Sequence, residues 1–161
     1  MRVIVFSDSH QHFSPLQQIV EKHPEADFFI HLGDGYQEFC DLQEQFPQKS
    51  FFFVHGNCDF GCYEPALRIL SANQAKILCV HGHTQGIKYS SEPLLALARQ
   101  EGCQIALHGH THAARIEYHD GIYLVCPGSV SQPRDSRASY AILDITGQGI
   151  VPVLVPLGAS L

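Results

Sequence analysis

The sequence predicts an α/β fold in which two β-sheets pack face to face and helices cover the outside. Two observations predict it. The first part of the chain alternates short apolar runs with amphipathic segments, whereas the later part consists mostly of short apolar runs separated by turn residues. The chain has 161 residues, of which 45% are hydrophobic. This is the size of one domain with a sizeable core, so we expect a single domain over residues 1–161.

The first half of the chain has a βαβαβ pattern. An apolar run over residues 2–7 indicates a buried strand. Ser14 and Pro15 are typical of a helix cap followed by proline at the first helical position, and Pro24 is expected to end this helix. The elements that follow are a strand over 27–32, a helix over 36–46 and a strand over 50–55. Because this last strand has three consecutive phenylalanines, we expect it to be buried on both faces.

The second half is expected to be mostly strands. Turn residues at Asn73-Gln74, Asp120-Gly121 and Gly147-Gln148-Gly149 each separate two apolar runs, which is typical of hairpins. One helix begins at Ser91-Glu92-Pro93 and ends at Gly102. The expected strands cover residues 66–70, 76–81, 104–107, 115–118, 122–126, 140–145 and 150–155.

Composition excludes several classes of protein. Ten Lys and Arg against 16 Asp and Glu give a net charge of −6, so no nucleic-acid-binding surface is expected. No apolar run approaches the roughly 18 residues of a membrane span, and the run over residues 3–6 is too short for a secretion signal. We therefore expect a cytoplasmic protein whose six cysteines are free, with Cys79 and Cys126 buried in their apolar runs.

Polar side chains follow the predicted strands at the point where each strand ends. Ligands bind at the carboxyl ends of strands in open α/β sheets, so these side chains are expected to converge on one crevice. Histidine, of which there are 11, is the commonest protein metal ligand. The segments are Asp8-Ser9-His10, Gly33-Asp34, Gly56-Asn57-Cys58-Asp59, His81-Gly82-His83, His108-Gly109-His110-Thr111-His112 and Pro127-Gly128-Ser129. Carboxylate, amide and imidazole donors suit Mn, Fe, Zn or Ni, and there are enough for two ions.

Competing motifs fail on spacing. The pair Gly33 and Gly35 lacks the third glycine of a dinucleotide-binding loop. After Gly56 and Gly61, Cys62-Tyr63 stands where a phosphate-binding P-loop needs Lys followed by Ser or Thr. Neither His-Glu-x-x-His nor Gly-x-Ser-x-Gly occurs in the sequence.

The ordered set of strand-end motifs resembles the calcineurin-like metallophosphoesterases. Their pattern is Asp-x-His, Gly-Asp, Gly-Asn-(His/Cys)-(Glu/Asp), a His before Gly, and Gly-His-x-His. The resemblance runs from Asp8 to His112, and the Pro127-Gly128-Ser129 segment extends it. The short chain looks like the small phosphodiesterase branch of bacteria and archaea, which includes a eukaryotic relative that acts as a sorting-complex scaffold.

The resemblance implies a four-layer αββα sandwich with two mixed sheets and two divalent metal ions, with Mn²⁺ first and Ni²⁺, Zn²⁺ or Fe²⁺ as alternatives. Asp8, His10 and His112 would hold one ion, Asn57, His81 and His110 the other, and Asp34 would bridge them. A hydroxide shared by the ions would then attack phosphorus in line. The implied partner is a small phosphate-ester substrate.

The residues expected to take part in catalysis are Asp34, Asn57, Cys58 and His83. Many members of the family have His where this chain has Cys58, and a thiol is a poorer acid for an alkoxide than an imidazolium is. This favours phosphodiesters with good leaving groups, or a proton from His83 or a water. Cys58, Asp59 and His83 each have a structural alternative as a filler, a turn residue or a supporting side chain. Arg134 is interpreted as a solvated charge rather than a substrate contact.

Three functions remain open from the sequence. A dinuclear phosphodiesterase is favoured, and a phosphomonoesterase on the same site is an alternative. A non-catalytic interaction scaffold on the same fold is the other alternative, but a scaffold can lose ligands, whereas this chain retains all seven. A homo-oligomer that closes the site is a further possibility.

Overall fold

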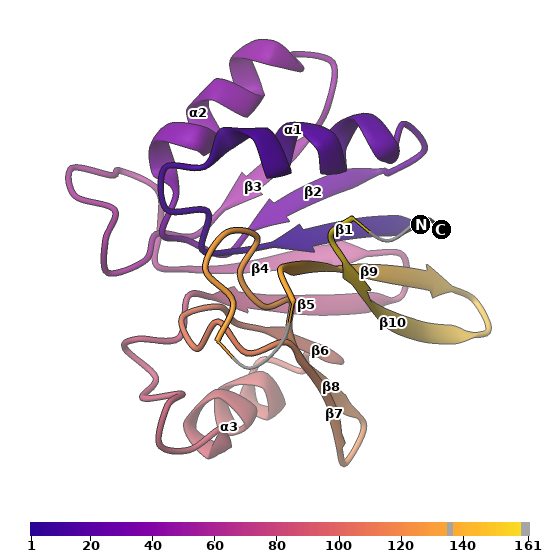
Figure 1. The fold of residues 1–161 in the computed structure, drawn as a ribbon. Coiled ribbons are helices and arrows are strands. Elements are labelled where there is room, and N and C mark those ends of the chain that lie inside the picture. The colour runs from indigo at the N-terminus through magenta and orange to yellow at the C-terminus, as the bar shows by residue number, and fades with distance from the viewer. Residues whose placement is uncertain (135–136, 159–161) are drawn as a thin grey trace.

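The computed structural model describes residues 1–134 and 137–158, and their strands form two five-stranded sheets with helices outside (Figure 1). In the first sheet the order is β10-β9-β1-β2-β3, and in the second it is β4-β5-β6-β8-β7. The strands are β1 (Arg2–Phe6), β2 (Phe28–His31), β3 (Phe51–Phe53), β4 (Leu67–Ala72), β5 (Ala75–Val80), β6 (Ile105–Leu107), β7 (Arg115–His119), β8 (Ile122–Cys126), β9 (Ser139–Thr146) and β10 (Gly149–Pro156). The helices are α1 (Phe13–Lys22), α2 (Tyr36–Gln45) and α3 (Glu92–Gln100).

The sheets form the two inner layers of a four-layer sandwich. Successive side chains of a strand point to opposite faces, so Val3 and Val5 of β1 face the core between the sheets, whereas Ile4 and Phe6 pack under α1 and α2. On the other side, Leu94 of α3 is buried against the second sheet. Figure 1 shows α1 and α2 above the sheets and α3 below them. The predicted αββα architecture is confirmed, and residues 135–136 and 159–161 of the predicted domain lie outside the described residues.

Two local predictions are wrong. Helix α1 begins at Phe13, with His12 as its N-cap residue, and no side chain caps it. Ser14 lies inside the first turn, where its Oγ accepts a hydrogen bond from Gln18, because the backbone turn from Ser9 to His12 starts the helix two residues earlier than predicted. Strand β3 is not buried on both faces: it is an edge strand of the first sheet, and Phe51 and Phe52 are half-buried.

The parallel strands direct the chain toward one edge. β1, β2 and β3 run parallel to one another, as do β5, β6 and β8. Figure 1 shows their arrowheads pointing to the left-hand side of the molecule. The two edges meet there, because Nδ1 of His81, after β5, donates a hydrogen bond to the carbonyl of Leu32, after β2, at 2.7 Å. No helix among the described residues is long and apolar enough to cross a membrane.

Candidate metal centre

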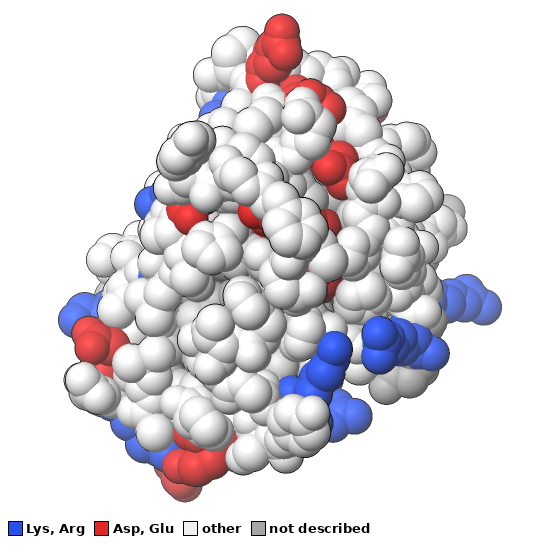
Figure 2. Space-filling view, turned by 90° about the vertical axis from the view of Figure 1, so that its left-hand side faces the viewer, with Lys and Arg blue, Asp and Glu red and all other residues white. Residues whose placement is uncertain are grey.

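The candidate ligands all lie just beyond the carboxyl ends of strands. Asp8 and His10 follow β1, Asp34 follows β2, Asn57 follows β3, His81 follows β5, and His110 and His112 follow β6. Figure 2 views this edge, and acidic side chains lie partly covered near the middle of the face, whereas basic side chains gather toward the lower right. The acidic groups are thus placed where the strands of both sheets end.

An unusual backbone conformation occurs at most of these positions. Asp8, His10, Asp34, His110 and His112 all have positive φ, from 42° at His10 to 65° at His110. Non-glycine residues rarely adopt this region, and such strain persists only where the surrounding structure over-determines it. The chain therefore turns sharply after β1, β2 and β6, and these turns bring polar side chains from separate strands together.

The first group of donors consists of Asp8, His10 and His112. Nε2 of His112 lies 3.2 Å from Nε2 of His10 and 3.2 Å from Oδ1 of Asp8. Nδ1 of His112 donates to the carbonyl of Gln132 at 2.7 Å, so in the neutral ring Nε2 presents a lone pair. The lone pair of His112, the Asp8 carboxylate and the His10 ring thus face one point, and this geometry fits a metal ion.

Asp34 lies between this group and His81. Its Oδ2 is 3.4 Å from Nε2 of His81 and 4.0 Å from Nε2 of His10, and its Oδ1 accepts the Cys58 N–H at 2.8 Å. Nε2 of His81 and Oδ1 of Asp8 are both buried without a hydrogen-bond partner among the described residues. A buried polar atom without a partner is costly, and a bound cation would satisfy both atoms.

Electrostatics keep the two carboxylates ionised. Burial alone would raise the pKa of Asp8 and of Asp34, but contacts with the histidines outweigh it, so both pKa values are lowered. Burial likewise acts to lower the pKa of His81, but Asp34 and Asp8 outweigh it and raise that pKa. Burial and the charge of His81 lower the pKa of His110 to about 4. The site thus offers two anionic oxygens and a neutral imidazole at His110, which is the form that binds metal.

The remaining predicted residues are less closely assembled. The His110 ring centroid lies 5.0 Å from that of His81, and the His83 ring centroid lies 5.4 Å from that of His81. Nδ1 of His83 is buried without a partner among the described residues. Asn57 is exposed, and its side-chain amide nitrogen donates to Sγ of Cys58 at 3.3 Å. The structure therefore brings the imidazoles together, while Asn57 lies at the rim.

The calcineurin-like phosphoesterase superfamily domain model matches residues 1–148, which is most of the chain. The chain belongs to this family. A Bacillus subtilis protein described as "Probable metallophosphoesterase YsnB" is 38% identical over 149 residues, which cover 90% of this chain and 85% of that protein.

Solved structures described as phosphoesterases share the fold. A Streptococcus pneumoniae protein described as a predicted phosphoesterase superposes with a TM-score of 0.80 at 25% identity, covering 96% of this chain and 97% of that one. A structure described as a novel archaeal phosphodiesterase superposes with a TM-score of 0.73 at 18% identity, covering 96% of this chain and 100% of that chain. At 18% identity the second likeness shows the fold alone.

Asp59 holds together the loops that carry the candidate metal ligands without being one of the predicted ligands itself. Its Oδ2 accepts the N–H groups of Asp34 and Gly56 at 2.8 and 2.6 Å, and its Oδ1 accepts those of Gly35 and Tyr36 at 2.8 and 2.9 Å. One carboxylate therefore joins the loops after β2 and β3 and caps the start of α2. The sequence leaves Asp59 open between a supporting residue and a turn residue, and its bonds to Asp34, Gly35 and Tyr36 favour the former.

A buried chain of hydrogen bonds behind the metal centre is missed by sequence reasoning. The Gly33 N–H donates to Nδ1 of His31, so Nε2 carries the proton and donates to Oγ of Ser9 at 3.0 Å. Ser9 in turn donates to Oε1 of Glu38 at 2.8 Å. This network fixes the turn between Asp8 and His10, and no local motif marks it because its members come from three separate elements.

Proposed function

We propose that this metallophosphoesterase hydrolyses phosphodiesters at a centre of two divalent transition-metal ions. The observation that carries the proposal is the pair of buried, unpartnered atoms, Oδ1 of Asp8 and Nε2 of His81, with Asp34 between them. Both atoms are metal-ligand types, and in an apolar interior neither would be left without a partner. Mn²⁺ is the ion to test first, with Ni²⁺, Zn²⁺ and Fe²⁺ as alternatives that the same donors suit.

The residues divide between two ions. The first would be held by Asp8, His10 and His112, the second by Asn57, His81 and His110, and both by Asp34. When bound, the two ions supply Lewis acidity and a hydroxide nucleophile at neutral pH. The protein's own contribution is to orient these ligands: the carbonyls of Gln132 and Leu32 fix the rings of His112 and His81 with Nε2 toward the centre.

The choice of diesters rests on the residues beside the centre. Desolvation and the charge of Asp34 raise the pKa of Cys58 to about 11, so in the metal-free protein its thiol is protonated at neutral pH and is not a nucleophile. With this group in place of an imidazolium, esters with good leaving groups are favoured. His83, whose pKa is lowered mainly by burial, faces the cluster as a neutral group that can orient a phosphate oxygen.

The test is hydrolysis of p-nitrophenyl esters by the purified protein with and without Mn²⁺. We expect Mn²⁺-dependent turnover of bis(p-nitrophenyl) phosphate, slower turnover of p-nitrophenyl phosphate, and loss of both in Asp34→Asn. A faster reaction with the monoester would assign the phosphomonoesterase alternative. Metal content of two ions per chain without turnover of either ester would assign the non-catalytic scaffold, and unaffected Asp34→Asn would overturn the metal centre.

A further inference from the structure

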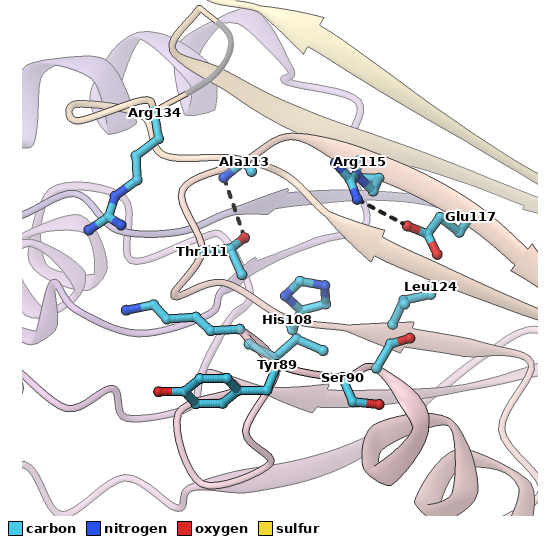
Figure 3. A pocket seen from close by; sticks show the side chains of 12 residues that line it. Tyr89, Ser90, His108, Thr111, Ala113, Arg115, Glu117, Leu124 and Arg134 are labelled. Carbon is cyan, nitrogen blue, oxygen red and sulfur yellow. Dashed lines mark hydrogen bonds and ion pairs between the residues drawn. The ribbon is translucent and has the colours of Figure 1, made fainter.

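A pocket of about 500 Å³ lies next to the metal centre, and none of the candidate metal ligands lines it. Its walls come from the segment after β6, the loop before α3 and the start of β7. Figure 3 shows Arg134 and Tyr89 on opposite sides of this pocket, with His108 between them. We call it the Lys88 pocket, and the residues that matter for its chemistry are Lys88, Tyr89, His108, Thr111, Arg115 and Arg134.

The Lys88 pocket adjoins the metal ligands through two links. Thr111, which lines it, stands in the chain between His110 and His112. The backbone N–H of Arg134, another lining residue, donates to the carbonyl of His112 at 3.3 Å. The candidate ligands themselves do not line the pocket, so it adjoins the centre through Thr111 and Arg134.

The charge of this pocket is opposite to that of the whole protein. The chain has a net charge of −6, yet the pocket is lined by three basic side chains and one acidic one. Arg115 and Glu117 form an ion pair with each other at 3.6 Å, on the right-hand side of Figure 3. No ion pair involves Lys88 or Arg134 within residues 1–134 and 137–158, so these two cations remain available to an anion.

A second pocket, lined by the candidate ligands His10 and Asp34, has a different composition. It has a volume of about 330 Å³ and is lined by His10, Asp34 and Cys58 together with the aromatic rings of Tyr36 and Phe60, and no Lys or Arg lines it. The Phe60 side chain is 91% exposed there. A diester at the metal centre thus meets an aromatic, acidic side and a basic side.

We propose that the Lys88 pocket binds a negatively charged group on one substituent of the phosphodiester, so that the preferred substrates carry a second anionic group, such as a phosphate or carboxylate, near the scissile phosphorus. Lys88 and Arg134 are the binding residues, and the hydroxyls of Ser90 and Thr111 line the same pocket. Arginine and lysine bind phosphate and carboxylate oxygens through charge-assisted hydrogen bonds. The inference rests on the proposed function, since it names the substrate class of the same centre.

The test compares two diesters with one leaving group. Ethyl p-nitrophenyl phosphate has an uncharged second substituent, and 2-phosphonoethyl p-nitrophenyl phosphate has an anionic one. Both release p-nitrophenolate, so the ratio of their kcat/KM values at one free Mn²⁺ concentration isolates the second substituent. We expect the wild type to prefer the phosphonoethyl ester by roughly tenfold or more, as two charge-assisted contacts provide, and the preference to shrink as ionic strength rises.

The decisive variant is Lys88→Gln/Arg134→Gln, in which the ratio is expected to fall to about one, because an uncharged amide does not distinguish the two substituents electrostatically. The matched control, Lys22→Gln/Lys49→Gln, removes the same charge on the side of the molecule covered by α1 and α2, away from the pocket, and its ratio should equal that of the wild type. A wild-type ratio of one or less, or a preference that persists in the Lys88 and Arg134 variant, would overturn the inference while the proposed function stands. Absence of Mn²⁺-dependent hydrolysis of either ester would overturn the proposed function and this inference with it.

Discussion

The two halves of the candidate ligand cluster differ in how completely the chain holds them in place. One half consists of Asp8, His10 and His112, and the other of Asn57, His81 and His110. In the first, one ligand atom from each residue lies within 4.8 Å of the others. In the second, His81 is buried with its Nε2 free, His110 is half-buried, and Asn57 is exposed with its side chain on Cys58. The first half is thus preorganised, and the second is only partly so.

The physical reason is the number of elements that fix each half. The Asp8 carbonyl accepts hydrogen bonds from the hydroxyls of Ser129 and Ser131 at 2.7 and 3.0 Å, and the Gln132 carbonyl orients His112. These bonds support Asp8 and His112, which both have left-handed backbone conformations. Asn57 has no such support for its side chain. Preorganisation lowers the cost of binding, so the two ions should bind with unequal affinity, the tighter one in the first half.

The largest effect is expected for Asp8→Asn. This change removes the buried carboxylate from the preorganised half and places an amide group beside two imidazoles that need a cation. Activity with Mn²⁺ should fall by more than about 100-fold, which is the upper end for removing a supporting partner of a ligand. The measurement is kcat/KM on bis(p-nitrophenyl) phosphate together with metal content per chain by elemental analysis.

Asn57→Ala is the contrasting variant. Because Asn57 is exposed and poorly fixed, its loss should weaken only the second ion, and one tightly bound ion per chain should remain in titrations with Mn²⁺. If Asp8→Asn and Asn57→Ala each lost both ions equally, the two halves would not bind metal independently. The proposed difference in affinity between the halves would then be wrong.

A smaller effect is expected for Asp59→Asn. The amide keeps one oxygen acceptor but places an NH₂ group against backbone N–H donors, so the loops after β2 and β3 lose part of their shared anchor. We expect metal affinity to fall about 10–100-fold and the free energy of unfolding to fall by about 1–3 kcal/mol. Calorimetric titration with Mn²⁺ measures the metal affinity, and urea unfolding measures the free energy of unfolding. A loss of stability with unchanged metal affinity would limit Asp59 to a structural role.

Asp59 also illustrates what the sequence predicts and what it does not. Strand-end positions of Asp8, Asp34 and His81 follow from apolar runs, because a run that ends in a polar residue marks the end of a buried strand. The four hydrogen bonds of Asp59 depend on how closely the loops after β2 and β3 approach. That distance is set by sheet packing and by Gly56, where a Cβ would collide with the Asp34 carboxylate, and no local pattern encodes it.

The same limit explains the two local errors. Ser14-Pro15 is a helix-start signal, but the turn from Ser9 to His12 is fixed by the ligand loop after β1, so the tertiary structure starts α1 earlier. Three phenylalanines in a row indicate burial on both faces, yet β3 is the last strand of its sheet. Periodicity predicts elements well, whereas strand order, and with it burial at an edge, depends on contacts distant in sequence.

The support behind the preorganised half should be visible in the pH dependence of stability. Burial lowers the pKa of His31 from 6.5 to about 4. Its neutral form is thus favoured in the folded state, whereas the unfolded chain takes up a proton near 6.5. The contribution of neutral His31 to the free energy of unfolding is therefore complete above about pH 6.5. It is lost as the pH falls toward about 4, by about 2 kcal/mol at pH 5. Urea unfolding of metal-free protein between pH 8 and pH 5 measures this loss.

The change His31→Gln should reduce the loss of stability between pH 8 and pH 5, because the titrating group is gone. His119→Gln, on β7 and remote from the metal centre, is the matched control and should retain the wild-type pH dependence. The other buried titratable groups remain in both variants, so the difference between the two isolates His31. Identical pH profiles would show that burial does not hold the His31 ring neutral.

The smallest effect is expected for Cys58→Ser, at the exposed edge of the second half. With its pKa raised to about 11, the thiol is protonated at neutral pH, and p-nitrophenolate leaves without needing a proton. The rate on bis(p-nitrophenyl) phosphate should therefore change less than about threefold, whereas removing a general acid costs about 10²–10⁴-fold. Cys58→His supplies an imidazole at the same position, and it should raise activity selectively on alkyl diesters, whose alkoxide leaving groups need a proton. A large loss in Cys58→Ser on the nitrophenyl ester would instead make the thiol part of the reaction, and would place the poorly fixed half at the centre of catalysis.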